Sequence, residues 1–486
     1  MKTLLERKIS LVVIILQFLV SLLVCIYFGT TGLVPVKYMV AIAVVMVVLL
    51  VYQVMSQLTN SSYIFGRVLA VLFCAVFLVG ANYVRESMAA FQNVGGATKK
   101  VDVISFYVMK DDAAKTLADA KNYSFGILRQ QDRENTDKAV QDASKKLNKT
   151  LNTVEYDDPL TMVDALYAKE VQAIIMNKSF VDTVKSQYKT FSTDTRELDA
   201  SKIESEVEEL VDTDVPTKPF NVYISGIDVY GAIETNSRSD VNIIAEVNPT
   251  THQILLVTTP RDYYVEIPEV SGGQKDKLTH AGIYGVDKSM KTLEKLYDTN
   301  LDFYARVNFT SLITMVDALG GVDVESEYAF TTSEDSGLVM DVVQGTNHFN
   351  GKQALAFSRE RQNVPGGDNQ RGKDQQAVIT AMIKKMVSPA ILTGANGILN
   401  SVSGNVETNM SEAQIQELIK TQLSENPQWT ITSMAADGTG DTQYCYSYSG
   451  KPLYVMQPNQ ESVDAIKETM DKVENGETLE GGTTTE

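Results

Sequence analysis

Three long apolar runs near the N-terminus constrain this chain more than any other feature. They cover roughly Ile9–Phe28, Tyr38–Met55 and Tyr63–Val84, and each approaches the ~20 residues that a helix needs to cross a membrane. A cleaved signal peptide has one short run, so three runs predict three retained transmembrane helices. A re-entrant hairpin of the second and third runs is the alternative, and it leaves the rest of the chain on the same side.

Basic residues around the apolar runs predict the orientation of this anchor. They precede the first run, separate the first two and open the third: Lys2, Arg7, Lys8, Lys37 and Arg67. Basic residues favour the cytoplasmic side. We therefore expect a cytoplasmic tail at residues 1–8, three transmembrane helices within residues 9–84, and an extracytoplasmic body in a multi-pass protein of the cell membrane.

The exported body is acidic and almost free of cysteine. The chain has a formal net charge of −18, three cysteines and three histidines. Cys25 and Cys74 fall in the apolar runs, so Cys445 alone remains, and neither an intramolecular disulfide nor a cysteine-based zinc site is expected. An acidic body is a poor nucleic-acid binder, so we expect no nucleic-acid partner.

Short strand-like and helix-like segments alternate at the start of the exported body. This pattern predicts a small accessory α/β domain, followed by an acidic linker or short exposed helix, "KIESEVEELVDTDVPTKP", together covering residues 85–219. We find no catalytic constellation in it. Its acidic pairs, Asp111–Asp112 and Asp157–Asp158, are explained as turn and capping residues.

The second unit is expected to span residues 220–475. It opens with an apolar strand, "FNVYISGID", and a hairpin, "DVNIIAEVNPTTHQILLVTTPRD", and continues with several periodic helical segments. The fold class predicted for the chain is therefore α/β, with an α/β sandwich as this second unit. Apolar helix faces here are either core or the walls of a lipid pocket. Residues 476–486 are polar and expected to be disordered.

Arginines recur at strand ends and turns of the second unit. They lie in "SRSD", "TTPRD", "SRER" and "GGDNQRGKDQQ", together with one glutamine: Arg238, Arg261, Arg359, Arg361, Arg371 and Gln375. A guanidinium group presents a planar fork of donors that suits phosphate. Each arginine alone could be a surface ion pair, but their shared position beside glycine, proline or a strand end favours one diphosphate site.

Aspartates interleaved with the arginines predict a divalent metal. Asp228 follows an apolar strand through a glycine, and Asp240 opens the next strand. Two carboxylates at neighbouring strand ends could share Mg²⁺, which binds one or two carboxylates plus phosphate oxygens. A turn aspartate and an N-cap are the simpler alternative. Asp262 is a candidate general base, or an ion-pair partner that orients Arg261.

The segment "QKDKLTHAG" adds charge near this site. Lys275 and Lys277 are expected at its mouth, and His280 is either a base or a structural histidine. The exported body has no G-x-S-x-G elbow, no H-E-x-x-H and no P-loop spacing. ATP would also be lacking outside the membrane, so a lipid-linked diphosphate is the more natural phosphate donor.

Six motifs in order resemble the LytR-CpsA-Psr (LCP) family of Gram-positive envelope proteins: "SGID…SRSD…VTTPRD…KLTHAG…FSRER…DNQRGKDQQ". The resemblance covers about residues 220–387, and the three spans with an extra α/β domain resemble the capsule-type members. It implies an α/β sandwich around a hydrophobic pocket that holds a polyprenyl diphosphate. It also implies transfer of a glycopolymer, here capsular polysaccharide, from that carrier to peptidoglycan, commonly to the C6 hydroxyl of N-acetylmuramic acid. Capsule assembly proteins would be further partners.

The resemblance also assigns site residues. Asp228 and Asp240 would hold Mg²⁺ or Mn²⁺. The diphosphate would be bound by Arg238, Arg261, Arg359, Arg361, Arg371, Gln375 and Lys277, and the catalytic group would be Arg261, Asp262, Arg359 and Arg361. Many relatives carry a second arginine near Asn369, so a neighbouring position is less basic here.

Three other functions stay open at this stage: a pyrophosphatase, a lipid-binding scaffold, and a membrane-bound regulator of capsule or envelope genes. Water and a sugar hydroxyl would use the same site, so the residues do not separate hydrolysis from transfer. The cytoplasmic tail at residues 1–8 is too short for a DNA-binding module, which speaks against direct control of transcription.

Overall fold

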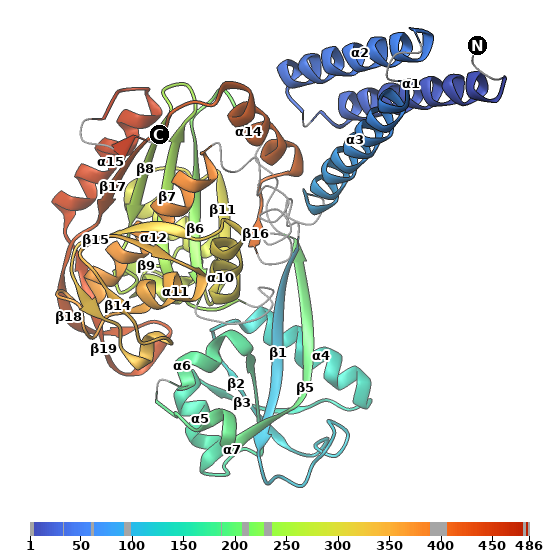
Figure 1. Cartoon of the computed structure of the whole chain (residues 1–486). Coiled ribbons are helices and arrows are strands. Elements are labelled where there is room, and N and C mark those ends of the chain that lie inside the picture. The colour runs from blue at the N-terminus through green and yellow to red at the C-terminus, as the bar shows by residue number, and fades with distance from the viewer. Residues whose placement is uncertain are drawn as a thin grey trace.

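The computed structural model describes residues 4–32, 34–59, 63–91, 99–185, 187–206, 213–227, 236–388, 406–479 and 483–484. Figure 1 shows three parts: a helical anchor, a small α/β unit and a larger α/β unit. The α/β fold class predicted from the sequence is confirmed.

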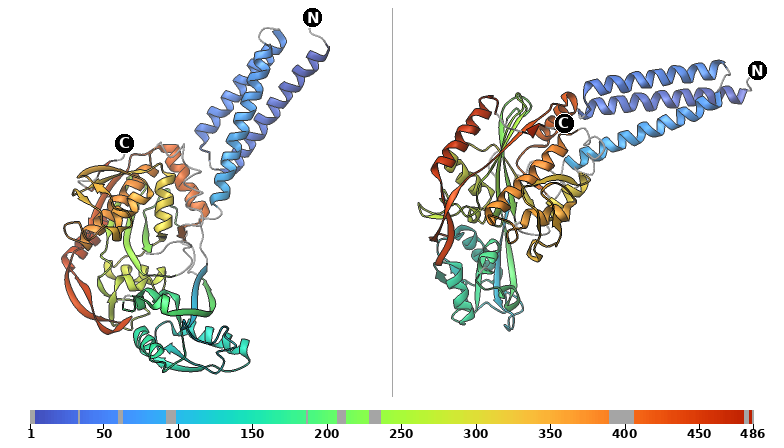
Figure 2. Two further views of the ribbon diagram at one scale, coloured as in Figure 1. Left: turned by 60° about the horizontal axis from the view of Figure 1, so that its bottom comes forward. Right: turned by 60° about the vertical axis from the view of Figure 1, so that its left-hand side comes forward.

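The anchor consists of three helices, α1 (Leu4–Thr31), α2 (Val36–Thr59) and α3 (Tyr63–Phe91). Each is long and apolar enough to cross a membrane, and apolar side chains cover the helices on most sides, as expected of residues that face lipid. One polar cluster joins the three helices: Gln57 Oε1 accepts from Ser10 Oγ at 2.8 Å and from Arg67 Nε at 3.2 Å. Figure 2 shows the three helices extending together away from the larger unit.

The small unit is a five-stranded sheet, ordered β3-β2-β4-β1-β5, with helices packed on it. Its elements are β1 (Lys99–Met109), β2 (Ser124–Leu128), α4 (Arg133–Leu147), β3 (Asn152–Tyr156), α5 (Pro159–Tyr167), β4 (Ala173–Asn177), η1 (Lys178–Phe180), α6 (Val181–Lys185), α7 (Phe191–Asp194) and β5 (Thr195–Glu206). Asp158 caps α5, as predicted, because its Oδ1 accepts from Leu160 N at 2.8 Å.

Strand β5 differs from the prediction. It pairs antiparallel with β1 from Met109↔Thr195 to Lys99↔Glu206. The first residues of the expected linker or exposed helix are therefore the end of a strand, and Ile203 is buried in the core of the small unit. Residues 207–212 of that segment lie outside the described residues.

The larger unit is built on a mixed sheet ordered β16-β11-β6-β7-β8-β17-β20. Its strands are β6 (Phe220–Ile227), β7 (Ser239–Asn248), β8 (Gln253–Thr258), β11 (Phe303–Asn308), β16 (Val406–Thr408), β17 (Thr430–Ala435) and β20 (Thr483–Thr484). β7 and β8 form the predicted hairpin, closed by the pair Asn248↔Gln253. The polar C-terminal segment is part of the fold where it is described: Leu479 N donates to Gln253 Oε1 at 2.8 Å, and β20 pairs with β17.

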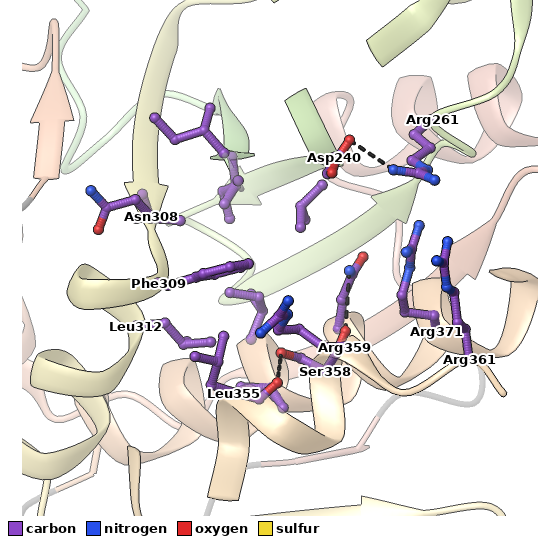
Figure 3. Close-up of a pocket in the computed structure, with 18 of the residues that line it drawn as sticks. Asp240, Arg261, Asn308, Phe309, Leu312, Leu355, Ser358, Arg359, Arg361 and Arg371 are labelled. Carbon is purple, nitrogen blue, oxygen red and sulfur yellow. Dashed lines mark hydrogen bonds and ion pairs between the residues drawn. The ribbon is translucent and has the colours of Figure 1, made fainter. Parts of the chain in front are cut away.

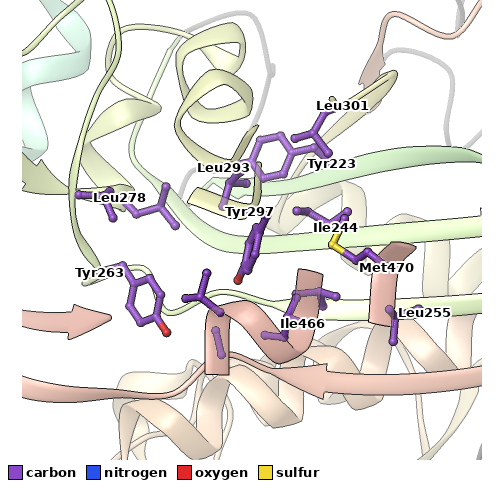
Figure 4. Close-up of a cluster of buried hydrophobic side chains, with 14 of the residues drawn as sticks. Tyr223, Ile244, Leu255, Tyr263, Leu278, Leu293, Tyr297, Leu301, Ile466 and Met470 are labelled. Atoms are coloured by element: carbon purple, nitrogen blue, oxygen red, sulfur yellow. The ribbon is translucent and has the colours of Figure 1, made fainter. Parts of the chain in front are cut away.

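Helices cover both faces of this sheet, which makes the unit a sandwich. One face carries α9 (Val286–Tyr297) and α15 (Gln460–Glu474); the other carries α10 (Phe309–Ala318), α11 (Gly351–Arg359), α12 (Asp368–Met386) and α14 (Glu412–Glu425). Successive strand residues point to opposite faces. Ile244 therefore joins Tyr223 and Leu255 in the core beneath α9 and α15 (Figure 4), while Ile243 joins the core beneath α12.

The remaining elements lie in the connections of the larger unit: β9 (Tyr264–Glu266), β10 (Lys275–Lys277), α8 (Leu278–Ala281), β12 (Val322–Ser326), β13 (Phe330–Thr331), η2 (Glu334–Ser336), β14 (Asp341–Val342), β15 (Gly345–Phe349), β18 (Gly438–Cys445) and β19 (Tyr448–Pro458). Helix α10 ends as predicted, because Gly320 and Gly321 adopt φ values of 74° and 88° that favour glycine.

Candidate functional site

A cavity of about 280 Å³ lies between the sheet and the helices α10, α11 and α12. Nine of its lining residues are apolar side chains from these elements: Ile224, Ile227, Val241, Val307, Phe309, Leu312, Leu355, Val378 and Ile379. Gly226 keeps the floor open, since a Cβ atom there would lie 2.6 Å from Val241 Cγ2. The apolar helix faces are therefore not only core but also one side of a pocket (Figure 3).

Arginines from four separate segments converge on this cavity: Arg238, Arg261, Arg359, Arg361 and Arg371. In Figure 3, Arg361 and Arg371 lie side by side and point toward Arg261. Among the described lining residues, the carboxylates are Asp240 and Asp335. Guanidinium groups thus outnumber carboxylates here in a chain that is acidic overall, which suits an anion with more than one charge.

Arg261 and Asp240 form the link between two neighbouring strands. Arg261 follows β8 and its Nη1 lies 3.0 Å from Asp240 Oδ1 in β7, which also accepts from Thr279 Oγ1 at 3.0 Å. Burial acts to raise the pKa of Asp240, but the charges of Arg261, Arg238 and Arg371 outweigh it and lower that pKa below its usual value. Asp240 is therefore a carboxylate at neutral pH.

Arg238 has a buried nitrogen, Nε, that lacks a hydrogen-bond partner among the described residues. Buried polar groups in folded proteins are nearly always paired, so an unpaired donor on a cavity wall points to a missing ligand. The sequence motif "SRSD" had placed Arg238 and Asp240 on the same side, and both do line the same cavity.

Arg359 and Arg361 are two residues apart and would share a face in an extended segment, but α11 ends between them. Arg359 is the last residue of α11, and its guanidinium carbon lies 4.4 Å from the centroid of the Phe309 ring, a cation–π contact. The chain then leaves the helix at Glu360, whose backbone is extended, and Arg361 still lines the same cavity.

Glu360 fixes the segment that follows, and sequence inspection did not identify it. It is fully buried, and its Oε1 accepts from the backbone nitrogens of Arg361 at 2.9 Å, Gln362 at 2.7 Å and Asn363 at 3.0 Å. Its Oε2 accepts from Ser333 N. Burial acts to raise the pKa of Glu360, but these hydrogen bonds lower it below its usual value. The carboxylate thus holds the segment of Arg361 against the backbone at Ser333.

Arg371 and Gln375 share one face of α12, as their spacing predicted. Gln375 Nε2 donates to Ser358 O at 3.3 Å, which joins α12 to α11. Val378 and Ile379 continue the same face into the apolar part of the cavity. Helical spacing from Gln375 would have identified both of them from the sequence.

A second cavity, of about 360 Å³, lies on the other side of the arginines. It shares four lining residues with the first: Asp240, Arg261, Arg371 and Gln375. The rest of its lining is mainly polar: Asn242, Thr258, Thr259, Pro260, Asp262, Asn369, Gly372, Lys373, Ala435, Ala436, Asp437, Tyr454 and Met456. The shared residues therefore form a wall between two spaces, and we call them the arginine wall. We call the first space, which has aliphatic and aromatic side chains along one side, the apolar cavity, and the second, bordered mainly by amide, hydroxyl and charged residues, the polar cavity.

Asp262 and Lys277 lie at the edge of the second cavity. Asp262 lines it, and its Oδ1 is 2.8 Å from Lys277 Nζ, while its Oδ2 is 3.8 Å from Arg261 Nε. Lys277 contacts Asp262 and lies over the ring of Tyr454 instead of lining the apolar cavity. Asp262 is thus ion-paired, and its role as a base stays a prediction.

His280 is a structural histidine. His280 is 4 % exposed, and its Nδ1 lies 2.6 Å from Asp276 Oδ1. His280 is not among the described residues that line either cavity. The base hypothesis therefore has no geometric support.

The predicted metal pair is described only in part, because Asp228 lies outside the described residues. Among those that are described, no group of three or more His, Cys, Asp or Glu side chains is arranged to hold a metal ion. Asp240 offers one ionised carboxylate at a phosphate-binding wall, which fits a Mg²⁺ site completed by phosphate oxygens. The metal itself stays a prediction.

The profile of the LytR_cpsA_psr family matches residues 181–472. The chain belongs to this family. A second profile, DNA polymerase processivity factor, matches residues 60–176, which begin near α3 and end within the small unit, so this match does not coincide with one structural unit.

Relatives include polyisoprenyl-teichoic acid–peptidoglycan teichoic acid transferases named TagU. The protein from Bacillus cereus (strain AH820) is 36% identical over 205 residues, 42% of this chain and 65% of the relative. That from Enterococcus faecalis (strain ATCC 700802 / V583) is 36% identical over 197 residues, 40% of this chain and 62% of the relative. The chain thus spans less than two thirds of these relatives.

Solved structures with a similar fold include TagT bound to LI-WTA and B. subtilis TagU. The first is 26% identical and covers 56% of this chain and 96% of that chain, with a TM-score of 0.43. The second is 27% identical and covers 55% of this chain and 100% of that chain, with a TM-score of 0.41.

Proposed function

We propose that this protein is an extracytoplasmic phosphotransferase that moves a glycopolymer from a polyprenyl diphosphate carrier to peptidoglycan. The arginine wall between an apolar and a polar cavity is the observation that carries this proposal. A lipid-linked diphosphate has an apolar end, a doubly charged middle and a sugar end, in the same order as the apolar cavity, the wall and the polar cavity. The TagU relatives are polyisoprenyl-teichoic acid–peptidoglycan teichoic acid transferases, which supports the same class of reaction.

The lipid end of the carrier would occupy the apolar cavity. Phe309, Leu312 and Leu355 lie together on one side of it (Figure 3), and removal of isoprenoid surface from water favours binding there. The diphosphate would then meet Arg238, whose Nε has no protein partner among the described residues, and the other guanidinium groups.

The polar cavity would receive sugar. It offers the exposed side chains of Asn369, Asp437 and Tyr454, and an amide, a carboxylate and an aromatic ring suit the hydroxyl-rich faces of a sugar. Tyr454 is 52 % exposed, so its ring is available to a large ligand. The acceptor hydroxyl of peptidoglycan would approach the phosphorus from this side.

The reaction follows from these positions. The acceptor oxygen forms a bond to the phosphorus that carries the polymer, and the bond from that phosphorus to the bridging oxygen breaks, so polyprenyl phosphate leaves. Arg261, Arg361 and Arg371 stabilise the negative charge on the transferring group and on the leaving oxygen. We propose that Asp262 takes the proton of the acceptor, with its ion pair to Lys277 holding the carboxylate at the edge of the cavity.

A divalent ion is part of the proposal. Asp240, together with Asp228 by family resemblance, would hold Mg²⁺ or Mn²⁺. When bound, the ion would supply further positive charge to the diphosphate oxygens.

The anchor and the polymer complete the proposal. We infer that the N-terminus is cytoplasmic and the body extracytoplasmic, because Lys2, Arg7 and Lys8 precede the first apolar run. This orientation places the arginine wall on the side where peptidoglycan is found. The resemblance to capsule-type members makes capsular polysaccharide the proposed polymer and capsule assembly proteins the proposed partners.

Reconstitution with carrier and acceptor tests the proposal. The full chain in detergent is given a polyprenyl-diphosphate-linked glycopolymer and peptidoglycan, and attached polymer and polyprenyl phosphate are measured. Equal amounts of both are expected. Polyprenyl phosphate with unattached polymer would identify a pyrophosphatase, and bound lipid without turnover a scaffold. Cells lacking the protein should release polymer that is normally wall-bound; changed capsule transcripts with normal attachment would favour the regulator.

A further inference from the structure

The small α/β unit contacts the larger unit beside the first strand of the arginine wall. Asn236 Nδ2 donates to Asp102 Oδ1 at 2.7 Å, and these residues are only 5 % and 3 % exposed. Asn236 precedes Arg238 by two residues and lies just before β7, while Asp102 lies in β1 of the small unit. A buried hydrogen bond between the two units thus ends next to a cavity-lining arginine.

Asp102 is itself held firmly within the small unit. Its carboxylate accepts from Asn177 Nδ2 at 3.0 Å and from Asn135 Nδ2 at 3.3 Å. The same two amides donate to Asp132, at 2.8 Å and 2.7 Å. A network in which several buried groups share partners fixes the position of each, so Asp102 presents its oxygen to Asn236 from a rigid support.

A second contact leads to Asp240 by another route. Ile283 and Tyr284 pack with core residues of the small unit, and the ring of Tyr284 meets that of Phe180 edge-on at 6.0 Å. The segment that carries them begins with Thr279, which donates from Oγ1 to Asp240 and from its backbone nitrogen to Arg261 O at 2.9 Å. One short segment, from Thr279 to Tyr284, therefore connects the core of the small unit to Asp240 and Arg261 of the arginine wall.

The two contacts meet at Gly282. A Cβ atom there would lie 2.6 Å from Ser237 O and 2.8 Å from Ser239 N, the backbone groups on either side of Arg238. The segment that ends in Tyr284 thus lies directly on the chain that presents Arg238. Movement of the small unit would act on both contacts at once.

We propose that the small α/β unit is a positioning module for the arginine wall, and that Asp102 is its positioning residue for Arg238 and Asp240. This inference rests on the proposed function for the meaning of that wall. Charges that bind a transferring phosphoryl group must be held within a fraction of an ångström, and a misplacement of 1 Å costs on the order of 10²-fold in rate. Of the nine apolar lining residues named above, Val241 alone lies on β7, and the others come from β6, β11, α10, α11 and α12, so we expect the apolar lining to depend little on the small unit.

The test separates the charged end of a ligand from its apolar end. The full chain in detergent is titrated with geranyl diphosphate and with geraniol, and the ratio of the two dissociation constants is the readout. Asp102→Ala and Asn236→Ala should each lower this preference for diphosphate by on the order of tenfold, with geraniol affinity unchanged. The double variant should lose no more than either single variant, since both remove one contact. Asp102→Asn, which keeps an acceptor oxygen, should lose less than Asp102→Ala.

The matched control is Asn152→Ala, which removes an exposed amide of β3 that donates to Ser124 Oγ at 2.7 Å within the same unit. It should keep the wild-type ratio. Wild-type ratios in both contact variants would overturn the proposal. So would a loss in Asp102→Ala alone, because Asn236→Ala cuts the same contact while leaving the network of the small unit intact. A wild-type chain that prefers the diphosphate but attaches no polymer would refute the proposed transfer reaction. The ratios of the two dissociation constants would still show whether the small unit positions the arginine wall.

Discussion

A buried carboxyl on α12 should make the stability of the larger unit depend on pH. Asp374 is 3 % exposed, its Oδ1 accepts from Gln370 Nε2 at 3.0 Å, and its Oδ2 has no hydrogen-bond partner in the described part of the chain. Burial raises the pKa of Asp374 to about 7. It lies on the helix that supplies Arg371 and Gln375 to the arginine wall, so its ionisation takes place close to the site.

The direction in which stability changes with pH follows from the raised pKa of Asp374. Above pH ~4 the unfolded chain loses this proton while the folded chain keeps it, so stability falls as pH rises to about 7 and then levels off. A shift of roughly three units at 1.36 kcal/mol each sets an upper limit of about 4 kcal/mol. In Asp374→Asn this dependence is absent, and any cost of burying the amide is the same at every pH.

The assay compares wild type and Asp374→Asn by thermal unfolding in detergent from pH 4 to pH 8. The free energy of unfolding of the variant relative to wild type should increase by up to about 4 kcal/mol across this range, which for a unit of this size is roughly 8 °C or more in Tm. Asp298→Asn, at a side chain that is 92 % exposed, is the control and should show no such trend. Parallel curves for wild type and Asp374→Asn would refute the argument, because they would mean that Asp374 ionises normally in the folded protein.

Further predictions concern the two cavities and the wall between them. Arg261→Ala should lower the transfer rate on the order of 10²-fold and also lower Tm, because it leaves the largely buried Asp240 without this ion pair, and Arg261→Lys should recover little of the rate because an ammonium lacks the bidentate fork; wild-type rates in both would exclude Arg261 from diphosphate binding. Asp240→Asn should raise the Mg²⁺ concentration needed for half-maximal rate, whereas full activity of wild type in excess EDTA would remove the metal from the mechanism. Leu312→Trp should fill the apolar cavity and reduce the lipid that copurifies, measured by mass spectrometry; normal loading would place the lipid elsewhere. Tyr454→Ala should raise KM for the peptidoglycan acceptor with little change in kcat, and an unchanged KM would separate Tyr454 from acceptor binding.

Local sequence signals identified the residues of the wall because local structure determines their direction. Arg261 follows a strand through a proline, and Arg371 and Gln375 are one helical turn apart, so strand ends and helical spacing were sufficient. The same spacing does not give the relative direction of Arg359 and Arg361, since α11 ends between them, although both line the cavity.

Local sequence patterns could not predict contacts between segments that are distant in the sequence. Two hydrogen bonds join residues that are far apart in the sequence: Glu360 accepts from Ser333 N, and Asp240 accepts from Thr279 Oγ1. No spacing rule predicts them. The second cavity depends on β8 pairing with β17, a neighbour chosen by the sheet order and not by the chain order. The period-two pattern around Ile203 was present, but high charge concealed a strand that is buried on one side.

The pairing of β1 with β5 has a consequence for the anchor. Lys99, where the described chain enters the small unit, is the direct partner of Glu206, where it leaves. A path that ends beside its starting point contributes almost nothing to the distance between the membrane helices and β6. The size of the small unit therefore does not by itself set the distance between the membrane helices and the arginine wall, and its contacts with the larger unit can be kept while its far end grows or shrinks.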